Sequence, residues 1–106
     1  MDPKSQAKYA ARAKVVKAMA HPTRLFIVDE LCREERCVQA LTKSIGADIS
    51  TVSKHLSILK NAGIVRDEKR GTQVFYSLLT PCVMKFFSCV EAVLKSAAKQ
   101  HLLLMR

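Results

Sequence analysis

The sequence predicts a mainly α-helical domain with one β-hairpin, in the order four helices, two strands and a last helix. Apolar residues recur at helical spacing in four segments before Gly63, and a β-rich stretch around Gly71 follows them. Thr80-Pro81 then precedes a long apolar segment. The 106 residues are the length of one domain, so residues 1–106 are expected to form a single unit.

The first two helices are predicted on either side of His21-Pro22-Thr23. Residues 4–19 combine apolar positions at helical spacing with a basic opposite face. Proline suits the first turn of a helix because no backbone N–H is needed there, so a second helix is expected from this point to about Cys32. The lone histidines His21 and His101 are interpreted as structural or surface residues.

The third and fourth helices lie close together in sequence. The third is expected near residues 38–45 and stops at Gly46, a residue typical of helix C-termini. Asp48 or Ser50 can cap the fourth helix, which Gly63 ends. Its apolar stripe consists of Val52, Leu56 and Leu59. The link of about four residues has the spacing of a helix-turn-helix.

A β-hairpin is predicted directly after these two helices. Residues 64–66 and 74–78 are rich in β-forming side chains and flank "DEKRGTQ", which places Gly71 in the turn. Thr80 is expected to cap the last helix, with Pro81 at its first position. A hairpin behind a helix-turn-helix makes the predicted fold a winged helix-turn-helix.

The last helix carries more apolar surface than one small core needs. Phe86 and Phe87 are neighbours in sequence and cannot both point inward. The excess predicts a partner helix, and therefore a homodimer through the first and last helices. A monomer that buries this helix completely is the alternative.

The charge of the chain points to a polyanionic partner. Lys and Arg number 18 against 9 Asp and Glu, a net charge of +9, which favours nucleic acid over a merely basic, soluble surface. No apolar run approaches the roughly 20 residues that a bilayer requires, so no membrane partner is expected. We expect a cytoplasmic protein, where thiols stay reduced.

In a helix-turn-helix, the N-terminal residues of the second helix face the base edges in the major groove. Residues 50–62 are the expected recognition helix. Short hydroxyl side chains allow close approach there, lysine can reach a phosphate or a guanine, and the hairpin tip can contact the backbone. The expected contacts to double-stranded operator DNA are Ser50, Thr51, Ser53, Lys54, His55, Lys60, Lys69, Arg70 and Thr72.

Four stretches in order carry a family resemblance: "HPTRLFIVDEL", "CVQAL", "DISTVSKHLSILKNAGIV" and "RGTQVFYSL". Together they resemble the ArsR/SmtB family of metal- and stress-responsive repressors, over about residues 18–78. The resemblance implies a homodimeric winged helix-turn-helix repressor that leaves its promoter when an inducer binds. It also implies DNA contacts by Ser50, Ser53 and Lys54.

The inducer site matches the family patterns only in part. Arsenic- and lead-sensing members carry Cys-Val-Cys at the start of the third helix, where this chain has Cys37 and then Gln39. The Asp and His ligands of zinc-sensing members fall on Thr80, Cys82, Val93 and Ser96. The paired cysteines of persulfide-sensing members fall on Asp29 and Lys95, although Cys32 and Cys89 lie on the corresponding helices.

The cysteines are the candidate inducer ligands: Cys32, Cys37, Cys82 and Cys89. Cys82 and Cys89 are about 10 Å apart along a helix, too far to share one ion or a disulfide. Cys37 is the best candidate, because a helix N-terminus stabilises a thiolate. The segment before it is expected to run beside the end of the hairpin, towards Cys82.

Three cysteines, Cys32, Cys37 and Cys82 or Cys89, would suit a soft thiophilic ion such as trivalent arsenic, bound as arsenite. Disulfide formation between any close pair is the rival switch, and a core position is the alternative for Cys32 and Cys89. No organic cofactor is expected. A thiol-redox enzyme would want a Cys-x-x-Cys pair, which the sequence lacks, so no enzyme activity is predicted. A protein-interaction module using the apolar last helix is a further alternative.

Overall fold

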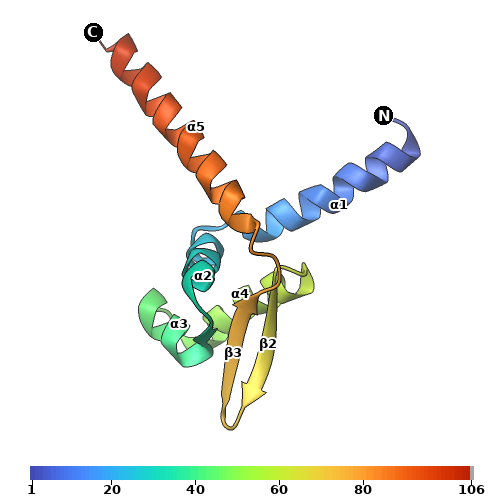
Figure 1. Cartoon of the computed structure of the whole chain (residues 1–106), viewed down its shortest axis with the longest axis vertical. Helices are drawn as coiled ribbons and strands as arrows, with labels where there is room; N and C mark the ends of the chain where they lie inside the picture. The colour runs from blue at the N-terminus through green and yellow to red at the C-terminus, as the bar shows by residue number, and fades with distance from the viewer. Residues whose placement is uncertain (106) are drawn as a thin grey trace.

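Two long helices project from a small body in the computed structural model, which describes residues 1–105 (Figure 1). The elements are α1 (Pro3–Met19), α2 (Pro22–Arg33), β1 (Arg36–Cys37), α3 (Val38–Ile45), α4 (Ile49–Asn61), β2 (Val65–Arg70), β3 (Gln73–Leu78) and α5 (Val83–Leu104). The body consists of residues 22–78, from α2 to β3. Helices α1 and α5 leave it at the end opposite the hairpin tip. The predicted winged helix-turn-helix is confirmed.

The sheet differs from the predicted hairpin in two ways. A short strand, β1, pairs antiparallel with β3, so the strand order is β1-β3-β2. The hairpin strands also continue almost to the turn, because Arg70 pairs with Gln73 and leaves Gly71 and Thr72 between them. Gly71 has a φ of 63°, a conformation that favours glycine in such a tight turn.

Local caps hold the two helices of the helix-turn-helix in place. The Oδ1 atom of Asp48 accepts a hydrogen bond from the Thr51 backbone N–H at 2.8 Å, so Asp48 rather than Ser50 caps α4. Gly46 ends α3 in the left-handed conformation, with a φ of 78°. His21 has the predicted structural role, since its Nδ1 atom accepts from the Thr23 N–H at the start of α2.

The start of α5 lies later than predicted. The helix begins at Val83 with Cys82 in the cap position, and no side chain caps it. Thr80 and Pro81 form a turn whose carbonyl groups accept from the N–H groups of Val83 and Met84. The connection from the hairpin therefore takes up two residues that were expected in the helix.

The core lies inside the body. Its fully buried side chains are Ile27, Val28, Leu41, Val52, Leu56, Leu59 and Val65. The end of α1 adds Ala18 and Met19, and the start of α5 adds Val83. Beyond these points the helices expose apolar residues, including Val16 at 47%, Val93 at 67% and Leu102 at 66%. Within residues 1–105, no helix is both long and apolar enough to cross a bilayer.

Candidate nucleic-acid interface

The outer surface of α4 begins with the predicted DNA-contacting residues. Ser50, Thr51, Ser53 and Lys54 are exposed, while Val52, Leu56 and Leu59 fix the opposite face to the core. Asp48 caps this first turn, and its Oδ1 atom also accepts a hydrogen bond from the Ser50 hydroxyl at 3.2 Å. Hydrogen bonds from Thr51 lower the pKa of Asp48, so the capping carboxylate stays ionised. The recognition helix thus presents a fixed polar turn.

The wing carries three predicted DNA contacts, of which only Arg70 has side-chain partners among residues 1–105. Lys69 and Thr72 are exposed next to the turn. The guanidinium of Arg70 instead donates to the carboxylates of Glu35 and Glu68, and lies 4.7 Å from the centre of the Phe75 ring. These hydrogen bonds raise the pKa of Arg70 and lower the pKa of Glu35. Arg70 therefore ties the wing to the segment before β1, a role that sequence reasoning missed.

Two further predicted contacts also connect elements of the body. Lys60, at the end of α4, pairs with Asp67 of β2 at 3.0 Å. On the other side of α4, the Nη1 atom of Arg24 donates to the Nδ1 atom of His55 at 3.1 Å. The rings of His55 and His21 lie 4.6 Å apart. Each of these contacts holds the recognition helix to another element.

The environment of His55 favours its neutral form. Burial lowers the pKa of His55, and the charges of His21 and Arg24 lower it further. A neutral ring with its proton on Nε2 can accept the Arg24 hydrogen bond at Nδ1. His55 thus contributes packing and hydrogen bonding at neutral pH rather than positive charge. Arg24 was missed because its partner is 31 positions away, although it belongs to the quoted "HPTR" run.

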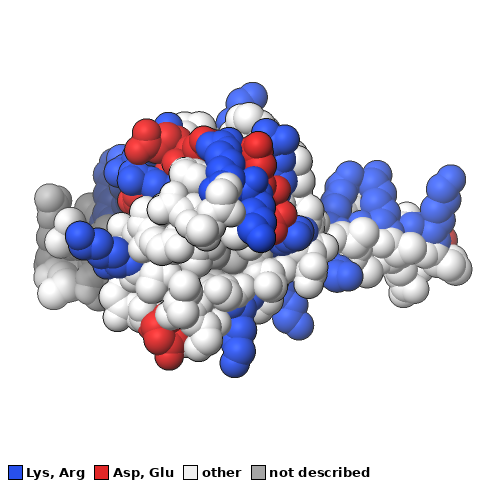
Figure 2. Space-filling model, turned by 90° about the horizontal axis from the view of Figure 1, so that it is seen from below, with Lys and Arg blue, Asp and Glu red and all other residues white. Residues whose placement is uncertain are grey.

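Basic side chains are spread unevenly over the molecule. Figure 2 views the molecule from the wing end and shows Lys and Arg beside Asp and Glu over the body, but mainly Lys and Arg along the projecting α1. The basic residues of α1 are Lys4, Lys8, Arg12, Lys14 and Lys17. The body therefore pairs many of its charges internally, whereas α1 supplies a largely uncompensated positive field.

The strand register fixes the position of Cys37 beside β3. Cys37 lies opposite Phe75, the third residue of β3. The strands are antiparallel and Arg36 pairs with Tyr76, so the residues before Cys37 run towards the hairpin exit. The segment before α3 therefore runs beside β3, and the expected approach of Cys37 to Cys82 stays a prediction. Cys37 caps α3 without a side-chain hydrogen bond.

The remaining cysteines lie along or opposite α5. Cys32 is half-buried and lines a cavity of about 230 Å³ together with Met84 and Phe87 of α5. Burial and the nearby Asp29 raise the pKa of Cys32, which keeps this thiol protonated. Cys82 and Cys89 are exposed, and all four cysteines are free thiols. Within one chain, residues 1–105 bring no three Cys, His, Asp or Glu side chains together as metal ligands.

The sequence matches known regulators over most of its length. Residues 21–67 match the family model described as "Bacterial regulatory protein, arsR family". The chain is 36% identical over 85 residues to the uncharacterized HTH-type transcriptional regulator MJ1325 of Methanocaldococcus jannaschii, covering 79% of this chain and 96% of that protein. It is also 36% identical over 90 residues to the HTH-type transcriptional regulator Rv0324 of Mycobacterium tuberculosis, covering 85% of this chain and 38% of that protein.

A third relative is named a repressor. The HTH-type transcriptional repressor SmtB of M. tuberculosis is 40% identical over 68 residues, which cover 64% of this chain and 50% of SmtB. The match thus spans less than half of Rv0324, half of SmtB and nearly all of MJ1325. The proteins it matches are regulators rather than enzymes.

Solved structures share both the fold and the sequence pattern. NolR from Sinorhizobium fredii superimposes with a TM-score of 0.80 at 31% identity, covering 88% of this chain and 93% of NolR. The homodimeric winged helix-turn-helix DNA-binding domain of Mb0332 from Mycobacterium bovis gives 0.79 at 31% identity, covering 95% and 94%. On the family match, the relatives and the shared fold, the chain belongs to the ArsR family of DNA-binding transcriptional regulators.

Proposed function

We propose that the protein is a homodimeric, cytoplasmic repressor that binds double-stranded operator DNA and is released by an inducer. The observation that carries this proposal is the outward polar turn of α4, in a domain that also exposes Lys69 and Thr72 at its wing tip. Such a turn can enter the major groove while Lys69 and Thr72 contact the neighbouring backbone. The net charge of +9 supplies the long-range attraction to DNA.

Homodimerisation through α1 and α5 completes the binding unit. Both helices expose apolar residues along their projecting parts, for example Tyr9 at 51% and Leu94 at 58%. A long apolar helix in water favours association with a second copy, and the Mb0332 domain is described as homodimeric. Two-fold symmetry would present two α4 helices to successive major grooves.

The inducer is proposed to be trivalent arsenic, as arsenite, or a similar soft metal ion bound by cysteines. One chain does not assemble three ligands within residues 1–105, so the site requires thiols from two protomers or a rearrangement around Cys37. Cys82 and Cys89 lie exposed at the start of the proposed dimer helix. A ligand that favours a dimer with misplaced α4 helices needs a coupling of about 1–3 kcal/mol to change DNA affinity roughly 5- to 150-fold.

A thiol-redox or persulfide switch is the alternative. Cys32 of α2 faces the first turns of α5 across the 230 Å³ cavity, and Cys89 lies on that helix. A polysulfide could accept the two electrons of two thiols, and the disulfide so formed between α2 and α5 would change the orientation of the dimer helix directly. The raised pKa of Cys32 disfavours the thiolate that either switch would need from this residue near neutral pH.

Fluorescence anisotropy tests the first part of the proposal, which is binding to operator DNA. Labelled DNA from the region upstream of the gene is titrated with the protein at several salt concentrations. The Ser53→Ala/Lys54→Ala variant should lose affinity, while Lys8→Ala, an exposed control on α1, should retain most of it. Wild-type affinity should fall steeply with salt. Equal affinity for this DNA and for unrelated DNA, or a flat salt response, contradicts the proposal.

Release experiments then separate the inducers. The preformed complex is titrated with arsenite, antimonite, lead, zinc, cadmium and a polysulfide, using wild type, Cys37→Ser and Cys32→Ser. Release by arsenite that requires Cys37 supports the metal site. Release by polysulfide that requires Cys32, with a mass change corresponding to a disulfide or polysulfide link, supports the alternative. Retention of DNA under every agent refutes the cysteine sensor.

A further inference from the structure

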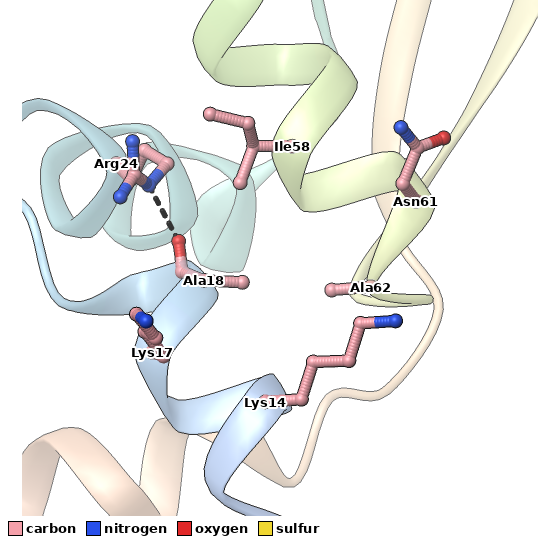
Figure 3. A pocket seen from close by; sticks show the side chains of 7 residues that line it. All are labelled: Lys14, Lys17, Ala18, Arg24, Ile58, Asn61 and Ala62. Carbon is pink, nitrogen blue, oxygen red and sulfur yellow. Dashed lines mark hydrogen bonds between the residues drawn. The ribbon is translucent and has the colours of Figure 1, made fainter. Parts of the chain in front are cut away.

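A cavity of about 350 Å³ lies between the end of α1, the start of α2 and the end of α4 (Figure 3). Lys14, Lys17 and Ala18 enter it from α1, and Arg24 enters from α2. Ile58 and Asn61 of α4, followed by Ala62, close the opposite side. The lining residues include none of the four cysteines, and the cavity lies beside the C-terminal end of the recognition helix.

The lining combines three cations with an apolar wall. The side chains of Ala18, Ile58 and Ala62 face the space, and Lys14 extends across it towards Ala62 (Figure 3). Among residues 1–105, none with a carboxylate side chain lines the cavity. Arg24 is held in place because its Nε–H donates to the Ala18 carbonyl at 2.5 Å. Arg24 and Lys17 lie on one side of the cavity and the end of Lys14 on the other (Figure 3). Cations beside an apolar surface are suited to a ligand with one anionic and one apolar end.

We propose that this cavity binds a small amphipathic organic anion. Its volume is at the lower end of the range for ligand pockets, which suits a short carboxylate or sulfonate with an apolar body. The anionic group pairs with Lys17 and Arg24, and the apolar body covers Ile58. This site would act as a second effector site, distinct in chemistry from any thiol sensor.

The position of the cavity connects the ligand to DNA binding. Arg24 reaches His55 in the middle of α4, while Ile58 and Asn61 are the cavity walls on the same helix. Lys14 and Lys17 belong to the helix proposed for dimerisation. A ligand that bridges α1 and α4 fixes the angle between them, and so changes the spacing of the two recognition helices. This effector role rests on the proposed function, whereas binding to the cavity does not.

Octanoate is a suitable probe, with octanol and octylamine as controls for charge. Binding to the full chain is measured by calorimetry and by amide NMR shifts. Octanoate should shift the signals of Ala18, Ile58 and Ala62, and should bind at least about tenfold more tightly than octanol. Equal affinity for octanoate and octanol, or shifts confined to α5, overturns the proposal.

Matched variants locate the site. Lys14→Gln/Lys17→Gln should weaken octanoate binding about tenfold, whereas Lys4→Gln/Lys8→Gln removes the same charge from α1 outside the cavity and should leave it unchanged. Ala62→Leu fills the apolar side and should also weaken binding, with folding checked by circular dichroism. Equal weakening by both double variants would indicate nonspecific attraction to α1 and overturn the site.

The effector role is tested separately with upstream DNA. Octanoate should change the affinity of wild type severalfold and should not affect Lys14→Gln/Lys17→Gln. Cavity binding without this change overturns the effector role. Failure of the protein to bind its upstream DNA without octanoate contradicts the proposed function instead, and leaves the calorimetric result for the cavity intact.

Discussion

The body and the projecting part of α5 contain similar side chains but place them in opposite environments. In α4, Val52, Leu56 and Leu59 are fully buried, while α5 has a single buried residue, Val83, among its 22 positions. Leu94 and Leu102 expose more than half of their surface. The body is therefore stabilised by its buried core. The projecting part of α5 has its backbone hydrogen bonds but leaves its apolar side chains exposed, as is typical of a helix that packs against a partner.

Removing a core side chain should have the largest effect. Leu56→Ala leaves a cavity at the centre of the body, so we expect a loss of about 2–5 kcal/mol in the free energy of unfolding. Ile49→Ala, at the 54% exposed start of the same helix, should cost much less. Urea denaturation followed by circular dichroism measures both. Similar losses for the two variants would show that α4 is not anchored by its inner stripe.

The next largest effect is expected on assembly. Leu94→Glu places a charge on the exposed apolar face of α5, and should weaken dimerisation about a hundredfold or more, because apolar burial is lost and a charge is desolvated. Lys99→Glu, on the more polar side of the helix, is the control. Analytical ultracentrifugation gives the dimer constant of each. A monomeric wild type, or equal weakening by both variants, would refute the dimer through α5.

The features predicted from the sequence depend on nearby residues. The apolar spacing of Val52, Leu56 and Leu59 defines one helix face, and Gly46 marks a helix end through its own backbone preference. These signals need no knowledge of the rest of the fold. They placed α4 and the wing correctly in the chain, while the DNA contacts on these elements stay a prediction.

The features that the sequence did not show are long-range pairings. Strand β1 has two residues and no alternating pattern, and its existence depends on β3. Arg70 donates a hydrogen bond to Glu35, which is 35 positions earlier. This wing arginine, predicted only as a DNA contact, therefore also joins the wing to the segment before β1. The position of Cys37 opposite Phe75 likewise depends on this long-range pairing of β1 with β3. The thiol chemistry therefore could not be inferred from spacing within the sequence.

The DNA contacts made by the body can be compared with those made by α1. We expect a smaller effect here than for the core or dimer variants. Lys54→Ala removes a side chain from the groove-facing turn, with an expected loss of about 1–3 kcal/mol, or roughly 5- to 150-fold in affinity. Lys8→Ala on α1 should lower affinity only slightly. Anisotropy with upstream and unrelated DNA checks both variants. A larger loss for Lys8→Ala would move the main contact from α4 to α1.

The smallest effect concerns pH and the contact between α2 and α4. The pKa of His55 is lower in the folded chain than its ordinary value of 6.5, so the unfolded chain binds the proton more readily. The stability from this site is complete above about pH 6.5 and is lost as the pH falls through that value towards the folded pKa. Protonation of His55 at Nδ1 would break the Arg24 hydrogen bond and place the charge beside Arg24 and His21.

His55→Asn removes this titration and should flatten the change in Tm between pH 7.5 and pH 5.5, by a few degrees relative to the parent. Both proteins are compared in the Leu94→Glu background, so that dissociation of α5 does not contribute to the transition. Identical pH dependence with and without His55 would show that the contact is insensitive to protonation. The pair is also compared without Leu94→Glu, and a difference that appears only there would place the sensitivity in the projecting helices instead of the body.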